Sequence, residues 1–318
     1  MKINKSASRA GLVALAICSA FLTACDKKEA SASGSPTPAA SSTRDTANAQ
    51  AKAKNTYIVT YNRLIDDNRS LAAIFKSYQR LQIQTKRPNA SSFYGDPATF
   101  DALFKTLKEA RTVGSGDAPL DTAADRLLAS GEKLLAVWTP LHPYFHAQGF
   151  LADNYVKARA EDANMTAAFT GALTEIDLFG QELDRVEDDR RANQMAKLKE
   201  KGEMASYYSI ETMALAKKFM GELQRIESGK NQQAMTRANT LTTELETSME
   251  NYRKAIAAKP ADASADAQKT AKANLDVQSK LQSMIGQWRV FSTSKSPSAM
   301  TGRNIVGYYN DAVQAASR

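Results

Sequence analysis

Residues 150–189 read FLADNYVKARAEDANMTAAFTGALTEIDLFGQELDRVEDD, and this stretch decides the fold class. From Met165 onward its large apolar side chains recur at steps of three or four residues, the spacing that places them on one face of an α-helix. The members of this face are Phe150, Tyr155, Val156, Met165, Phe169, Leu173, Ile176, Phe179, Leu183 and Val186. Charged and small residues occupy most positions between them, as on a helix with one buried face. We therefore predict a long amphipathic helix here.

The same period extends to both sides of this stretch. On its N-terminal side, residues 57–78 mark one face of a long helix, and the pair Asp96-Pro97 marks the start of another. On its C-terminal side, further helical runs end at Ser228-Gly229 and at Pro260. No stretch alternates apolar and polar residues as a strand does. We predict an all-α fold, an antiparallel bundle of roughly seven or eight helices that forms one domain over residues 56–318.

The N-terminus has the pattern of a secretory signal. Three basic residues and no acidic residue precede an apolar run at 10–24, which is too short to cross a bilayer as a helix. The run ends in Leu22-Thr23-Ala24-Cys25, which resembles the lipobox of bacterial lipoprotein precursors. The resemblance implies removal of a signal peptide, residues 1–24, and acylation of Cys25 with chains such as palmitate. An ordinary signal peptide is the alternative, but it leaves the register of charge, apolar run and cysteine unexplained.

Acylation of Cys25 makes a membrane anchor, because two or three acyl chains bind far more strongly than one. We expect the body of the protein in the periplasm. The choice between inner and outer membrane stays open: Asp26 resembles the inner-membrane retention signal of enterobacterial lipoproteins, a rule that varies among bacteria. Because Cys18 leaves with the signal and Cys25 is alkylated, no thiol remains, which excludes disulfides, cysteine-bound metals and cysteine nucleophiles.

Residues 25–55 are expected to form a flexible tether. Ala, Ser, Thr, Lys and Pro dominate this segment, and such a composition buries too little apolar surface to offset the entropy lost on ordering. About 28 flexible residues have a root-mean-square span of about 30 Å. The tether would therefore hold the helical domain clear of the lipid headgroups.

The charge of the chain suggests its class of partner. The sequence has 42 basic and 34 acidic residues and a formal net charge of +8. Three basic residues leave with the signal peptide, so the mature chain has 39 basic residues and a net charge of +5. A weakly basic envelope protein suits a partner protein, an anionic lipid or an acidic glycan. Export, and the lack of a dense basic stripe interleaved with aromatic residues, exclude nucleic acid.

Short phrases near both ends of the body echo each other: Tyr61-Asn62-Arg63-Leu64-Ile65 and Tyr309-Asn310-Asp311-Ala312-Val313. Between them lies an aromatic and Asp-Asn stretch, with Tyr144-Phe145, Phe150 and Asp153-Asn154-Tyr155. With the lipobox, these phrases are similar to the YiiG-type family of bacterial lipoproteins, whose shared domain is described only as of unknown function. The resemblance covers most of residues 56–315 and implies an all-helical envelope lipoprotein, with no catalytic or binding residue to transfer. The echo itself favours the first and last helices as neighbours, with coincidence as the alternative.

One segment, residues 138–155, combines aromatic residues with two prolines and a glycine. Pro140 and Pro143 are expected to interrupt or kink the helical path. A kinked, aromatic-lined segment can open a groove for a ligand or a partner helix, or its rings can simply fill the space that the kink leaves. The candidate binding residues are Trp138, His142, Tyr144, His146 and Tyr155.

The histidines of this segment are the sharpest candidate for metal chemistry. His142 and His146 stand four residues apart, a spacing that suits zinc on an unbroken helix. Pro143 lies between them and is expected to spoil that register, and the glutamate of a zinc-protease motif is missing. We therefore predict no metal and no cofactor.

Together these observations favour a non-enzymatic envelope protein, anchored by lipid, that binds another envelope component or scaffolds an assembly. The alternative is a periplasmic module that binds a small molecule or a metal at residues 138–155. An enzyme acting on peptidoglycan or lipid is a third hypothesis, which no phosphate loop or nucleophile motif in the sequence supports.

Overall fold

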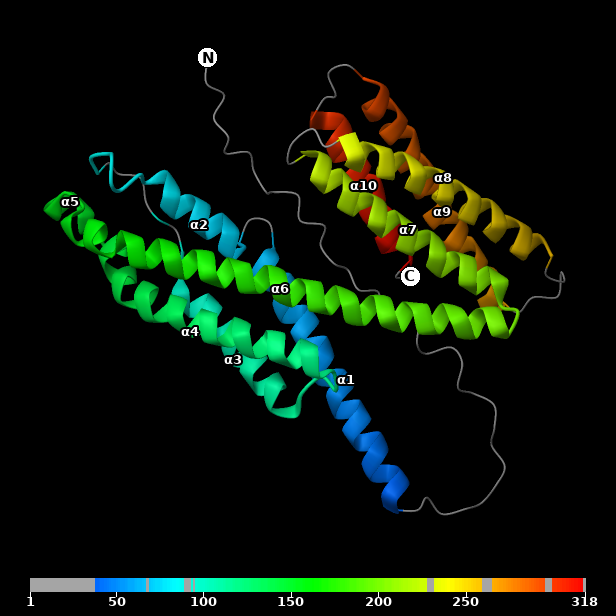
Figure 1. The fold of residues 1–318 in the computed structure, drawn as a ribbon, viewed down its shortest axis with the longest axis horizontal. Coiled ribbons are helices and arrows are strands. Elements are labelled where there is room, and N and C mark those ends of the chain that lie inside the picture. Colours follow the sequence, from blue (N-terminus) through cyan, green and yellow to red (C-terminus); the bar gives the residue numbers. More distant parts are fainter. Residues whose placement is uncertain are drawn as a thin grey trace. The chain divides into compact units, whose positions relative to one another are not determined.

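The computed structural model describes residues 38–66, 69–88, 93, 95–227, 232–258, 265–294 and 299–316. Within these residues every regular element is an α-helix, and there are ten (Figure 1). The predicted all-α fold is therefore confirmed, with more helices than the seven or eight expected. The signal peptide and Cys25 lie outside the described residues, so the structure does not bear on either. In the described part of the chain, no helix has both the length and the hydropathy that crossing a bilayer requires.

The chain divides into two compact units, where the sequence favoured a single domain. Among the described residues, the N-terminal unit lies within residues 38–189 and the C-terminal unit within residues 190–316. The boundary falls inside α6 (Val156–Glu200), whose helical period continues through it without a break. A continuous helix carries no linker composition, and for this reason the sequence does not mark the boundary. Each unit has its own buried aromatic residues.

The N-terminal unit begins with α1 (Pro38–Ile65) and α2 (Leu71–Arg80). The sequence predicts one helix over this region, but the chain turns between them, and Ser70 starts α2 by accepting the backbone N–H of Ala73 at 3.1 Å. The unit continues with α3 (Pro97–Val113), α4 (Ala118–His146), the single turn α5 (Phe150–Asp153) and α6. As predicted, Pro97 opens α3, and Asp96 caps it by accepting the N–H of Ala98 at 2.9 Å.

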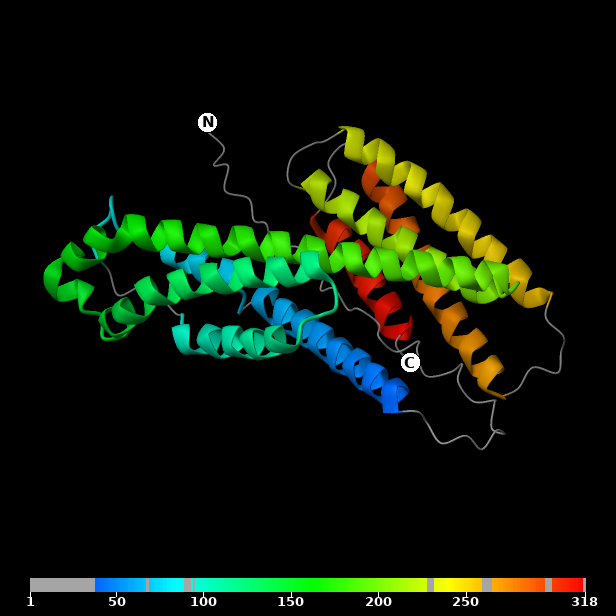
Figure 2. The ribbon, with the colours of Figure 1, turned by 60° about the horizontal axis from the view of Figure 1, so that its bottom comes forward.

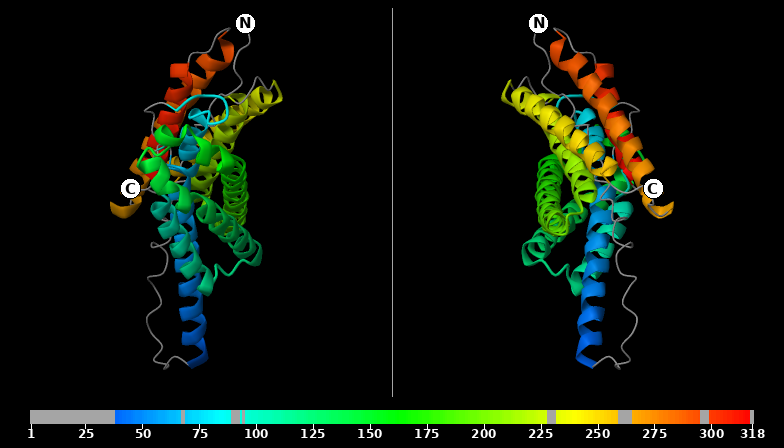
Figure 3. Two further views of the ribbon diagram at one scale, coloured as in Figure 1. Left: turned by 90° about the vertical axis from the view of Figure 1, so that its left-hand side faces the viewer. Right: turned by 90° about the vertical axis from the view of Figure 1, so that its right-hand side faces the viewer.

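The first half of α1 corrects the predicted tether, because residues 38–55 are helical. Side chains 44–49 are all exposed, and the buried contacts of α1 begin at Ala53 and Tyr57. The segment is rich in alanine, the best helix former, and adding a turn to a helix that is already fixed in a core costs far less than starting one. The start of α1 consequently extends beyond α3 and α4 (Figure 3).

Aromatic contacts align the helices of the N-terminal unit. Tyr57 lies against Phe179, with ring centroids 5.8 Å apart. Farther along the chain, Phe75 stacks on Phe169 at 5.0 Å. As α1 and α2 proceed, their partner positions on α6 move backward, so α6 runs antiparallel to both. The predicted antiparallel packing is therefore confirmed for these helices.

The C-terminal unit packs four helices, α7 (Met204–Glu227), α8 (Gln232–Ala257), α9 (Ala265–Thr293) and α10 (Ala299–Ala316). Helix α7 packs mainly on α8, and α9 mainly on α10. Trp288 lies edge-on to Phe219 at 5.2 Å, and its indole N–H donates to Asn239 Oδ1 at 3.0 Å, which ties α9 to both α7 and α8. The core between these helices includes Met220, Leu223, Leu245, Met249, Leu281, Ile285, Ile305 and Tyr309.

The two Tyr-Asn phrases lie in different units. Tyr61 is on α1 of the N-terminal unit, where its ring lies 6.2 Å from that of Phe179. Burial raises the pKa of the Tyr61 hydroxyl to about 12, with smaller contributions from the charges of Asp184 and Asp177. Tyr309 is on α10 and belongs to the core of the C-terminal unit. Each tyrosine therefore has a packing role of its own.

Candidate functional site

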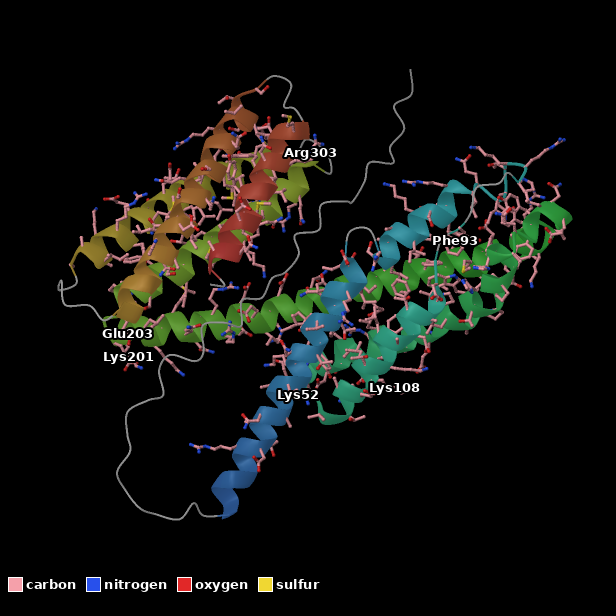
Figure 4. The ribbon with its side chains drawn as sticks, turned by 180° about the vertical axis from the view of Figure 1, so that it is seen from behind. Lys52, Phe93, Lys108, Lys201, Glu203 and Arg303 are labelled. Carbon is pink, nitrogen blue, oxygen red and sulfur yellow. The ribbon has the colours of Figure 1, made fainter. Side chains whose placement is uncertain are left out.

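The turn that joins α4 to α6 contains most of the residues singled out from the sequence. We call residues 142–159 the tip: they comprise the end of α4, the single turn α5 and the start of α6. Within the N-terminal unit, the tip lies at the end opposite to the start of α1 (Figures 1 and 2). Lys52 on α1 and Lys108 on α3 lie toward the α1 end, and Phe93 lies toward the tip (Figure 4).

Trp138 lies one turn below the tip and is fully buried. Its ring centroid lies 5.3 Å from that of Phe169, 5.6 Å from Phe100 and 5.9 Å from Phe93. A Cβ on Gly95 would approach the indole to 2.6 Å, so the backbone also comes close on that side. Trp138 is thus the centre of an aromatic core, as expected for a large ring surrounded by other rings.

Tyr155 is also buried, and it closes the tip from inside. Its ring stacks on that of Phe150 with centroids 5.2 Å apart. To bring the ring there, the backbone is left-handed at Asn154, with φ 52°, and at Tyr155, with φ 64°. A bulky residue seldom adopts this conformation, so the burial of the ring has to offset its cost. The packing of the Tyr155 ring therefore fixes the path of the backbone in the tip.

Tyr144 and Asp153 hold the two sides of the tip together. The Tyr144 hydroxyl donates to Asp153 Oδ1 at 2.8 Å, and the backbone N–H of Lys157 donates to Asp153 Oδ2 at 3.0 Å. Burial, followed by the hydrogen bond to Asp153, raises the pKa of the Tyr144 hydroxyl. Burial alone would raise the pKa of the Asp153 carboxyl, but the donors around it together hold that pKa below its usual value. Asp153 is therefore a charged, internally bonded carboxylate.

Arg159 fastens a neighbouring loop to the tip. Its Nε donates to the carbonyl oxygen of Ile83 at 2.9 Å, its Nη1 to that of Asn154 at 3.0 Å, and its Nη2 to that of Lys86 at 3.4 Å. The loop that follows α2 consequently lies beside the tip. Helical periodicity carries no signal for such a clamp, so the sequence does not point to Arg159, and it marks Asp153 only as part of the Asp-Asn stretch and not as a hydrogen-bond partner of Tyr144.

The histidines stand on a helix that the prolines do not interrupt. Helix α4 extends through Pro140 and Pro143 to His146, so of the two predicted effects, an interruption or a kink, the interruption is wrong. The rings of His142 and His146 accordingly lie on one face, with centroids 5.7 Å apart. Among the described residues, no group of three or more His, Cys, Asp or Glu side chains is placed to hold a metal ion.

The predicted binding residues therefore separate into two groups. Trp138 and Tyr155 pack inside the unit, which fits the alternative that the rings fill space. Tyr144 and His142 are half-buried and His146 is exposed, so these three reach the surface of the tip. Their binding role stays a prediction.

Comparison with known proteins adds the family. A family model described as a protein of unknown function (DUF3829) matches residues 50–312. The chain belongs to the DUF3829 family. No curated protein and no solved structure matches the chain. The DUF3829 match includes the tip and extends into both units, so the expected resemblance to a domain of unknown function is confirmed at that level.

Proposed function

We propose that this protein is an envelope lipoprotein of the YiiG type, anchored to a membrane through Cys25, with its helical body in the periplasm as a non-enzymatic binding or scaffolding module. The observation that carries the proposal is the layout of the N-terminal unit. Its first helix begins thirteen residues after Cys25, and its tip lies at the opposite end (Figure 1). Such a unit suits a protein held at one end that presents the other to a partner.

Contacts along the unit set its scale. Near the start of α4, Arg185 Nη2 lies 2.5 Å from Asp117 Oδ1 and the Tyr57 hydroxyl donates to Asp121 at 2.9 Å. From that level, α6 covers about 44 Å back to Val156 at 1.5 Å per residue, and α1 covers about 28 Å from Pro38 to Tyr57. This stretch of α6 by itself is longer than the hydrocarbon core of a bilayer, which is about 30 Å thick.

The anchor is tested at Cys25. Replacing Cys25 with Ser should leave the precursor uncleaved and stop incorporation of labelled fatty acid, because a hydroxyl cannot replace the thiolate that forms the thioether. The measurement is metabolic labelling with an alkyne fatty acid, followed by gel mobility of the precursor. Cys18→Ser is the matched control, since Cys18 lies within the signal peptide and should leave labelling unchanged. Fatty-acid labelling of the Cys25→Ser chain would disprove the lipoprotein proposal.

A further inference from the structure

We infer that the tip is a docking surface for a membrane that contains anionic phospholipid. The inference rests on the proposed function, because the lipid anchor at Cys25 is what would hold the protein so that its tip can meet a second surface. The inference names a class of partner, which neither the fold nor the family identifies. Three properties of the tip support it: exposed apolar side chains, exposed basic side chains on the tip and its neighbouring loop, and a fixed backbone.

Two large apolar side chains of the tip are exposed. Val156 is 65% exposed, the highest value among the large apolar side chains of the described residues. Leu151 is 48% exposed and stands five positions earlier, across the α5 turn. Single exposed apolar residues are common on protein surfaces, but two within six residues at the end of a unit form a local patch that water solvates poorly.

Exposed basic side chains lie on the tip and on the loop beside it. Lys157 follows Val156 directly and is exposed. Lys86 and Arg87 are exposed on the loop that Arg159 fastens to the tip. In the described part of the chain, none of these three side chains forms an ion pair, and the Lys157 ammonium lies 5.5 Å from the centroid of the Tyr144 ring, a cation–π contact. The charges of Lys86 and Arg87 are therefore available to an anionic surface.

Three carboxylates nearby accept hydrogen bonds from neutral donors of the same unit. Asp153 accepts from Tyr144 and from the backbone of Lys157. Asp162 accepts from the Tyr78 hydroxyl at 2.8 Å and from Gln84 Nε2 at 2.9 Å. Glu161 accepts from Asn164 Nδ2 at 3.0 Å. Because these donors are neutral, the three carboxylates keep their charges and offset three of the four basic groups Lys86, Arg87, Lys157 and Arg159. The net charge of the tip and its neighbouring residues is therefore +1.

Apolar side chains beside basic ones match a lipid surface better than a glycan. Basic residues are drawn to anionic headgroups, and apolar residues gain by entering the boundary between headgroups and acyl chains. An acidic glycan offers the charge but no apolar layer for Leu151 and Val156 to enter. The stacked Phe150 and Tyr155 rings and the Tyr144–Asp153 hydrogen bond keep these two side chains outside the core, so docking needs no rearrangement of the tip.

A vesicle-bridging assay tests the inference on the processed, acylated full-length chain. The protein is reconstituted into dye-labelled vesicles of neutral phosphatidylcholine, and capture of a second vesicle population is measured by energy transfer. We expect capture of vesicles containing phosphatidylglycerol and little capture of neutral ones, weakening in 1 M salt because screening shortens the range of the charges to about 3 Å. Removing one basic residue should lower capture about fivefold, and Lys86→Gln, Arg87→Gln and Lys157→Gln together about a hundredfold.

A second pair of variants tests whether the exposed apolar side chains contribute to capture. The double variant Leu151→Ser, Val156→Ser should lower capture at least about tenfold. Its matched control is Val59→Ser, Val113→Ser, which removes side chains that are 42% and 52% exposed on the same unit but away from the tip, and which should capture like the native chain. Loss in the basic variant with no loss in the Leu151, Val156 variant would show that charge alone drives capture, and would overturn the inference that the apolar side chains enter a lipid layer.

Failure of the anchor and failure of docking are separable in the same assay. A protein that does not float with the neutral vesicles contradicts the proposed lipid anchor, and the docking inference is then measured by flotation of the same protein with anionic vesicles. A protein that floats with the neutral vesicles but captures anionic and neutral partners equally contradicts the docking inference alone.

Discussion

Gly131 shows how a single position in the N-terminal unit depends on tertiary contact. It lies in the middle of α4, where glycine costs about 1 kcal/mol relative to alanine. A Cβ at this position would meet the ring of Phe104 at 2.7–2.8 Å, closer than atoms of a packed core approach. Phe104 on α3 is itself buried and cannot swing away. Glycine at 131 therefore allows α3 and α4 to pack closely.

Replacing Gly131 with Ala should lower the free energy of unfolding by about 1–3 kcal/mol, because overpacking outweighs the gain in helix propensity. Gly171→Ala is the matched control at an exposed position of α6, since a Cβ there would meet only Ser130 Oγ at an ordinary 3.6 Å. It should raise stability by up to about 1 kcal/mol. Urea denaturation measures both, and equal effects of the two substitutions would contradict the packing of α3 on α4.

At the scale of the element, α4 accommodates two prolines without ending. Pro140 and Pro143 are both exposed, so each ring faces solvent while the buried face of the helix continues through Leu141 and Phe145. The buried contacts on that face hold the helix in register, although each proline removes a backbone hydrogen bond. The local sequence predicts an interruption or a kink, and the helix continues without an interruption because its buried face packs in the core.

Replacing Pro143 with Ala should therefore stabilise the protein by about 2 kcal/mol, the helix-interior cost of about 3 less about 1 for the freer unfolded chain. The control is Pro119→Ala, in the first turn of the same helix, where the missing N–H needs no partner and no gain is expected. Denaturant midpoints compare the two variants. A destabilising Pro143→Ala substitution would show that α4 is not helical through this position.

At the scale of the whole molecule, each unit contains one tryptophan in its core. Trp138 reports on the N-terminal unit and Trp288 on the C-terminal unit. Phe169 touches Trp138, with ring centroids 5.3 Å apart, and Phe219 touches Trp288 at 5.2 Å. Two cores built from different helices favour two unfolding transitions over a single one.

In single-tryptophan chains, Phe169→Ala should lower the stability reported by Trp138 by about 3–5 kcal/mol and leave the transition of Trp288 in place. Phe219→Ala should do the reverse. Fluorescence during urea unfolding measures both midpoints. If either substitution shifts both transitions equally, the units unfold as one cooperative domain.

The sequence by itself determined the all-α fold class, the start of α3 at Asp96-Pro97 and the lipobox that predicts acylation at Cys25, because each of these depends on residues a few positions apart. Only the tertiary structure decided that residues 38–55 continue α1, that α4 passes through Pro143, and that the chain forms two units. It also decided that Trp138 and Tyr155 turn inward while Leu151 and Val156 turn outward. The physical reason is that burial depends on which faces of distant helices meet, and helical periodicity shows that a face exists without showing what covers it.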